Sequence, residues 1–134
     1  MSGDVRVVRA GAEYAGRQGL TMFVGVSAET VGAIGLCLHR LVVPPGGRAR
    51  AHVHAGHESA IYVLAGDVDV RWGEALEHTS SVSAGDFMYI PPGVPHAPIN
   101  HSATDPAYAL VARTDPNEQE SVVLRPDLDD LLLT

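Results

Sequence analysis

Three histidines and a glutamate lie within seven residues of this chain, at His52, His54, His57 and Glu58. Because side chains alternate between the two faces of a strand, His52 and His54 would project from the same face and could offer two imidazoles to one ion. Imidazole and carboxylate groups are common ligands of divalent transition metals. The residues alone leave a second interpretation open, in which these histidines lie on the surface or make local hydrogen bonds.

A further histidine, His96, follows the proline-rich segment PPGVP at residues 91–95. Proline fixes the backbone just before the next expected strand, and a rigid approach suits a ligand held in one position. His52, His54, Glu58 and His96 are therefore the candidate metal ligands. Cys37 is the single cysteine, so neither an intrachain disulfide nor a thiolate cluster for a metal is expected.

Short apolar runs separated by glycine and proline turns predict many short strands rather than long helices. The expected strands cover residues 5–9, 21–26, 35–43, 50–54, 60–64, 67–72, 76–80, 87–90, 96–100 and 107–113. So many strands in 134 residues predict an all-β barrel or jelly roll, an architecture that shortens or removes exposed sheet edges.

Three local features refine this expectation. Gly66 is expected to turn a hairpin between the apolar runs on either side of it. The tail RPDLDDLLLT, residues 125–134, could form one short helix, because Pro126 suits a first turn and the leucines could dock on the barrel. His39 alternates with outward residues of its strand and could point into the barrel as a proton carrier, although a surface or hydrogen-bonded histidine is the more ordinary role.

The composition argues against several kinds of partner. The formal net charge is −7 and the nine basic residues are scattered, whereas binding nucleic acid requires clustered Lys and Arg. No apolar segment approaches the roughly 20 residues that span a bilayer, and the first residues lack the apolar core of a secretory signal. We therefore expect a cytoplasmic protein without nucleic-acid or membrane partners, folded as one domain over residues 1–134.

Two motifs give the chain its resemblance to the cupin family. The first, G-x5-HxH-x3 or 4-E-x6-G, begins at Gly46 and occupies residues 46–66. The second, G-x5-PxG-x2-H-x3-N, occupies residues 85–100 and matches at Gly85, Pro91, Gly93, His96 and Asn100. The resemblance implies a single-domain double-stranded β-helix, or jelly-roll barrel, in which the motif histidines and glutamate hold one divalent metal. It also implies a homodimer.

The carboxylate is the point at which this sequence departs from the cupin pattern. Counted forward from His54, Glu58 is in an allowed position, but seven residues rather than six separate it from Gly66, and counting back gives Ser59. A shift of one residue turns a side chain to the opposite face of a strand. We favour Glu58, turned inward by a β-bulge near Ser59, with His57 next and Ser59 last. Three histidines completed by solvent are the alternative.

Three imidazoles and one carboxylate suit Fe, Mn, Zn, Ni, Co or Cu as a divalent ion, and the sequence does not select among them. The resemblance implies a metalloenzyme of the dioxygenase, decarboxylase, isomerase or lyase type that acts on a small polar organic substrate, and we favour an oxidoreductase, a dioxygenase. One alternative is a non-catalytic cupin that binds or senses a small molecule. Another is a cupin whose metal site has become a hydrogen-bonded polar core.

Two further groups of side chains are candidates for contact with a substrate. Arg40, Arg48 and Arg50 lie before or within the first part of the first motif and could bind a carboxylate, although solvated positions on the surface are the more ordinary interpretation. The larger side chains Tyr62, Trp72, Met88 and Tyr89 could line a pocket, but packing in the barrel core is the favoured interpretation.

Overall fold

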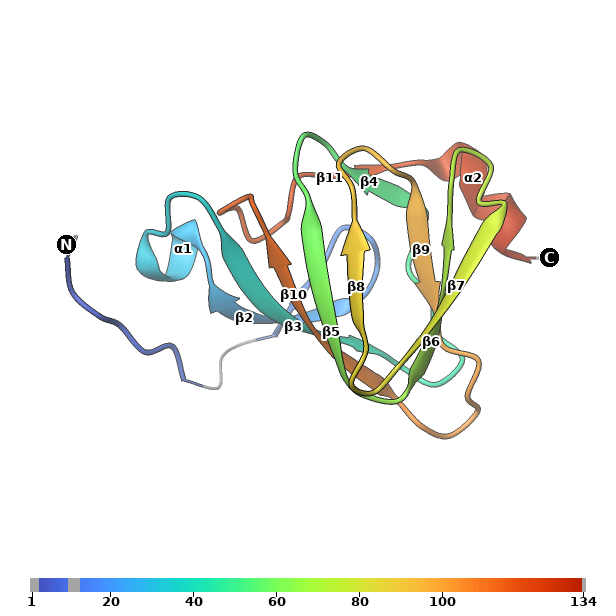
Figure 1. The fold of residues 1–134 in the computed structure, drawn as a ribbon, viewed down its shortest axis with the longest axis horizontal. Helices are drawn as coiled ribbons and strands as arrows, with labels where there is room; N and C mark the ends of the chain where they lie inside the picture. The colour runs from blue at the N-terminus through green and yellow to red at the C-terminus, as the bar shows by residue number, and fades with distance from the viewer. Residues whose placement is uncertain (1–2, 10–12, 134) are drawn as a thin grey trace.

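The computed structural model describes residues 3–9 and 13–133, whose strands form two antiparallel sheets (Figure 1). The six-stranded sheet has the order β1 (Glu13–Ala15), β2 (Thr21–Val26), β3 (Cys37–Val43), β10 (Ala107–Arg113), β5 (Ser59–Ala65) and β8 (Phe87–Ile90). The five-stranded sheet has the order β11 (Val122–Leu124), β4 (His52–His54), β9 (His96–Ile99), β6 (Asp67–Trp72) and β7 (His78–Ser83). The expected all-β jelly-roll architecture is confirmed.

The inward face of the six-stranded sheet changes from apolar to polar along its length. In β3 and β10 every second side chain is buried, as expected for strands that cover a core with one face. At one end Val43 pairs with Ala107 within the main apolar cluster. At the other end Cys37 pairs with Arg113, and His39 is buried two positions along β3. Polar inward side chains therefore gather at one end of the barrel.

Gly66 does not turn a hairpin, so that expectation is wrong. It connects β5, which pairs with β10 and β8, to β6, which pairs with β7 and β9 in the other sheet. Gly66 has a φ of 85°, and a Cβ added there would lie 2.9 Å from Cα of Ala107. The position therefore requires glycine both for its backbone conformation and for this close approach.

The sequence-based strand boundaries are least accurate near the chain ends. The strand expected at residues 5–9 is wrong: the segment forms no strand and Val5 is 97% exposed, so the alternation of its valines does not reflect burial. The three-residue strands β1 and β11 are too short for a periodic signal. The strand expected at residues 76–80 is displaced to β7. A short helix that was not expected, α1 (Ala28–Val31), is capped by Ser27.

The expected C-terminal helix is confirmed as α2 (Pro126–Asp129), which continues into a 3-10 turn, η1 (Asp130–Leu133). Pro126 begins it, as its fixed φ favours. Leu128 packs with Ala51 and Leu76 in a small apolar cluster, and Asp129 accepts a hydrogen bond of 2.8 Å from the backbone N–H of Ala51. The tail thus anchors the residue that precedes β4. Within the described residues, no helix is long and apolar enough to cross a membrane.

Candidate metal centre

Three histidines from two neighbouring strands form one buried cluster. His52 and His54 share the inward face of β4, as their spacing predicts, and His96 of β9 pairs directly with His52. Their exposed fractions are 2%, 2% and 3%. Each can offer a ring nitrogen that lies within 4.8 Å of those of the other two. The sequence-based expectation that these three residues converge agrees with this geometry.

Backbone carbonyls fix the orientation and tautomer of all three rings. Nδ1 of His52 lies 2.6 Å from the carbonyl oxygen of Arg50. Nδ1 of His54 lies 2.7 Å from the carbonyl oxygen of Glu120, and Nδ1 of His96 lies 2.9 Å from that of Val94. A carbonyl only accepts, so in a neutral imidazole Nδ1 carries the proton and Nε2 keeps its lone pair. Hydrogen bonds of this kind orient metal-binding histidines in proteins.

The environment also keeps the three imidazoles uncharged. Burial, with a smaller contribution from His54, lowers the pKa of His52 to about 3. Burial followed by the positive charge of Arg113 lowers the pKa of His54 to about 2. Burial and the neighbouring His52 lower the pKa of His96 well below its usual value. All three are therefore neutral at physiological pH, the form that binds a metal.

A buried ion pair, which the sequence motifs do not indicate, borders the cluster. Arg113 donates a hydrogen bond of 3.0 Å to Nε2 of His54 and forms a salt bridge with Glu120. Burial lowers the pKa of Arg113 to about 10, so the guanidinium stays charged at neutral pH. Arg113 could have been found from the sequence, because it occupies an inward position of the alternating strand 107–113. Glu120 lies in a loop and carries no such signal.

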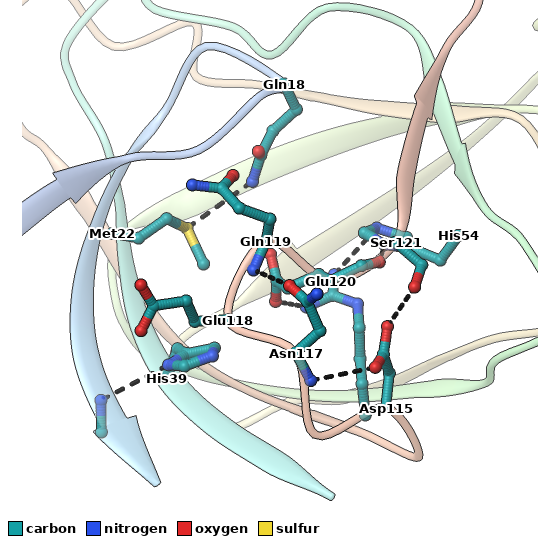
Figure 2. A network of polar contacts seen from close by, with 12 residues as sticks. Gln18, Met22, His39, His54, Asp115, Asn117, Glu118, Gln119, Glu120 and Ser121 are labelled. Carbon is teal, nitrogen blue, oxygen red and sulfur yellow. Dashed lines mark hydrogen bonds and ion pairs between the residues drawn. The ribbon is translucent and has the colours of Figure 1, made fainter. Parts of the chain in front are cut away.

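The loop between β10 and β11 holds Glu120 beside His54 (Figure 2). Asp115 accepts a hydrogen bond from the hydroxyl of Ser121 and thereby closes the loop. Glu120 has a φ of 65°, in the left-handed region that residues other than glycine rarely adopt. In this conformation one residue presents its backbone carbonyl to His54 and its carboxylate to Arg113.

Glu58, the favoured carboxylate ligand, is not brought together with the histidines. It is exposed, and its carboxylate accepts a hydrogen bond of 3.1 Å from the hydroxyl of Tyr89. Ser59 takes the inward position instead, with a buried hydroxyl that has no hydrogen-bond partner among the described residues. His57 is half-buried and lies 3.7 Å from the carboxylate of Asp115. The cluster therefore contains three histidines without a carboxylate from the first motif.

The position of a β-bulge explains this register. A bulge near Ser59 would have turned Glu58 inward, but the irregularity lies at the other end of β5, where Tyr108 pairs with Ala65 and Ala109 with Val63. The extra residue between Glu58 and Gly66 is thus absorbed after Val63. From Ser59 to Val63 the strand keeps regular alternation, and Glu58 remains on the outer side.

A second group of potential ligands, formed by Cys37, His39 and Glu120, is also buried, with ligand atoms within 4.8 Å of one another. The backbone N–H of Gly25 donates to Nδ1 of His39, which places the proton of the neutral ring on Nε2. Burial lowers the pKa of His39 to about 4, so the ring is neutral. This group therefore presents an N–H rather than a free lone pair, and it suits a metal less well.

The other candidate side chains lie away from the cluster. Arg40, Arg48 and Arg50 are exposed, which agrees with the interpretation that they are solvated surface residues. The guanidinium of Arg40 lies over the ring of Phe23, 4.4 Å from its centroid. Asn100 of the second motif is buried and donates to the backbone carbonyls of Val43 and Asp105, so its role is structural.

Two cavities meet at His96. An inner cavity of about 30 Å³ is lined by His52, His96 and Arg113 among others. A larger cleft of about 280 Å³ lies between β8 of one sheet and β6 and β7 of the other, with Trp72 and Tyr89 on its walls. The expectation that these aromatic side chains pack in the core is wrong, because they are 38% and 59% exposed. The two cavities share four residues of their walls, Val70, Met88, Ile90 and His96.

The residues present fit a divalent metal ion. Three neutral imidazoles with Nδ1 bound to carbonyls are a donor set for a borderline transition metal. A metal on His54 would replace the hydrogen bond from Arg113, whose guanidinium would keep its partner Glu120. The cluster could therefore hold an ion with no protein carboxylate in the ligand set.

Comparison with known proteins agrees with this architecture. Residues 39–113 match the family model described as a cupin domain. An oxalate oxidase in complex with the substrate analogue glycolate superposes with a TM-score of 0.72 and 21% identity, over 93% of this chain and 66% of that chain. The Lactobacillus farciminis oxalate decarboxylase formate complex superposes with a TM-score of 0.71 and 20% identity, over 84% of this chain and 33% of that chain. A predicted oxalate decarboxylase from Thermotoga maritima superposes with a TM-score of 0.66 and 20% identity, over 84% of this chain and 98% of that chain.

At these identities the likeness shows a shared fold. The chain spans just under two thirds of the length of the oxalate oxidase. A search of curated protein sequences found no match.

Proposed function

This chain belongs to the cupin family, and we propose that it is a metal-dependent cupin that binds one divalent transition-metal ion through His52, His54 and His96. The observation that carries the proposal is the set of three hydrogen bonds from Nδ1 to backbone carbonyls, which directs the Nε2 lone pairs of His52 and His96, and that of His54 shared with Arg113, to one buried cluster. Such hydrogen bonds satisfy any buried imidazole, but three rings that share one tautomer and converge at one point are the arrangement of metal ligands.

The chemistry that we propose is the conversion of a small organic substrate in the cavity beside these histidines. A divalent ion there would supply Lewis acidity and, if redox-active, electron transfer. We favour an oxidoreductase of the dioxygenase type over an isomerase or a lyase, and the oxalate oxidase and oxalate decarboxylases among the structural neighbours support a metal-dependent reaction of a small acid. Arg113 would orient the acid, because a guanidinium matches a carboxylate.

One observation favours a different function. The hydrogen bond from Arg113 satisfies Nε2 of His54 without a metal, as it would in a cupin whose metal site has become a polar core. Such a protein would bind a small molecule without turnover.

Metal titration separates the two proposals. Protein purified without added metal is analysed for bound metal and then titrated with Fe²⁺, Mn²⁺ and Zn²⁺. We expect about one equivalent of at least one ion, lost in His96→Ala and retained in the control His101→Ala, an exposed histidine outside the cluster. Uptake below about a tenth of an equivalent with all three ions would exclude the metal-dependent function. Turnover of small acids by the loaded protein then distinguishes an enzyme from a binding protein.

A further inference from the structure

The open cleft beside His96 indicates the kind of ligand that the site takes. We infer that this ligand joins a carboxylate to a compact apolar body, such as one aromatic ring. The carboxylate lies in the inner cavity beside Arg113, and the apolar body lies in the cleft between Trp72 and Tyr89. This inference rests on the proposed metal centre and names the substrate class of that same site.

A divalent ion in this cluster would favour an anion in the inner cavity. Imidazoles that donate Nδ1–H to backbone carbonyls and bind a metal through Nε2 contribute no charge, and the charges of Arg113 and Glu120 offset each other. Because Glu58 lies outside the cluster, no carboxylate of the first motif offsets a bound divalent ion, which would keep both of its positive charges in a buried site. Uncompensated buried charge is strongly unfavourable, so a negatively charged group on the ligand stabilises the loaded centre.

The guanidinium of Arg113 is placed to contact that group. It lines the inner cavity together with His52 and His96. Its hydrogen bond to Nε2 of His54 is lost when that nitrogen binds a metal, which frees one N–H donor. A carboxylate in the cavity would accept this hydrogen bond, and a buried guanidinium N–H without an acceptor is costly.

The cleft itself is suited to an apolar group. Its walls carry Val70, Met88, Ile90 and Val94 besides Trp72 and Tyr89, and none of the described residues that line it has a charged side chain. Its volume of about 280 Å³ is just below the range of typical ligand pockets, roughly 300–1,000 Å³, and suits one ring or a branched alkyl group. A wholly polar acid such as oxalate would leave these apolar walls in contact with water.

The cleft and the inner cavity are adjacent. Their shared walls place His96 between them, so a ligand whose apolar body lies in the cleft would extend its carboxylate past this side chain to the histidine cluster. The mouth of the cleft lies between the edge strands β8 and β7, which belong to different sheets and do not pair with each other. Exposed aromatic side chains beside a buried polar cluster are typical of a ligand site.

Trp72 is the single tryptophan of the chain, so its fluorescence reports on the cleft. Zn²⁺-loaded protein is titrated with phenylacetate, with acetate, which lacks the ring, and with phenylacetamide, which lacks the charge. We expect phenylacetate to change the emission of Trp72 and to bind at least about tenfold more tightly than either control. Equal affinity for acetate, equal affinity for phenylacetamide, or no binding by any of the three would overturn the inference.

A pair of variants on β8 locates the apolar body. Tyr89→Ala removes a wall of the cleft and is expected to weaken phenylacetate binding several-fold, whereas Phe87→Ala, two residues away and 81% exposed outside the cleft, is expected to leave it unchanged. Equal effects of both variants would contradict the placement. Metal content is measured in the same samples: absence of bound metal after loading with Zn²⁺, Fe²⁺ and Mn²⁺ in turn would refute the proposed function, whereas bound metal without discrimination among the probes would refute this inference alone.

Discussion

Arg113 donates a hydrogen bond of 3.0 Å to Nε2 of His54, the nitrogen through which this histidine would bind a metal ion. The bond and the metal exclude each other, because both require the same lone pair. The positive charge of Arg113 further opposes a cation, and its salt bridge with Glu120 offsets that effect. Arg113 therefore competes directly with the metal for His54.

Removing this competitor should strengthen metal binding. In the double variant Arg113→Met with Glu120→Gln, neither charge is left unpaired in the interior, and the carbonyl of residue 120 can still hold His54. Loss of one charge-assisted hydrogen bond corresponds to about a tenfold gain in affinity, measured by competition with a chelator. The two changes leave the net charge unaltered, so the matched control is Arg125→Met with Asp127→Asn, which removes an ion pair outside the cluster. Weaker binding in the double variant would contradict the competition.

Glu58→Gln should leave metal affinity unchanged within about twofold. Glu58 is exposed and bonded to Tyr89 on the outer side of the sheet, so its charge does not reach the cluster. Isothermal titration of the variant beside the parent protein checks this, with His52→Ala as the variant expected to lose binding. A drop of tenfold or more in Glu58→Gln would show that the carboxylate is a ligand after all.

Metal affinity should change little between about pH 7.5 and about pH 5.5. Lowered pKa values keep a histidine neutral down to its folded pKa, so His52, with a pKa of about 3, and His54, with a pKa of about 2, gain no proton in this range. The pKa of His96 is lowered in the same direction. Three imidazoles with an ordinary pKa of about 6.5 would together lose roughly 1,000-fold. Metal titrations at several pH values distinguish a nearly constant affinity from this loss. A fall in metal affinity of more than about tenfold between about pH 7.5 and about pH 5.5 would contradict the account.

Gly66→Ala should destabilise the fold more than Gly46→Ala. Both glycines have positive φ, so each substitution costs about 1–2 kcal/mol in backbone strain. At Gly66 the new Cβ would also meet the backbone of Ala107 at 2.9 Å, whereas at Gly46 no atom of the described residues lies within 4 Å. Denaturant unfolding of the two variants measures the difference. Equal losses would show that the turn between the sheets adjusts freely.

The parts of the centre that the sequence predicts are those set by short-range spacing. The HxH pattern places His52 and His54 on one face of a strand, and the second motif brings His96 to the same point. Hydrophobic alternation likewise predicts most of the longer strands. These features depend on residues close together in the chain.

The parts that the sequence does not predict depend on how distant segments pack. Arg113 and Glu120 meet His54 only because the loop after β10 folds back over β4. The outward position of Glu58 depends on where β5 absorbs its extra residue, and the bulge is set by pairing with β10 rather than by the motif. Val5 lies in a run that alternates like a strand but remains exposed, because this segment does not pack against the core.

Anomalous diffraction from crystals of the metal-loaded protein tests the central claim most directly. The account predicts one strong peak per chain at coordination distance, about 2.0–2.2 Å, from Nε2 of His52, His54 and His96, with the side chain of Glu58 still on the outer face beside Tyr89. No peak at the cluster, or a peak that also has the Glu58 carboxylate as a ligand, would contradict it.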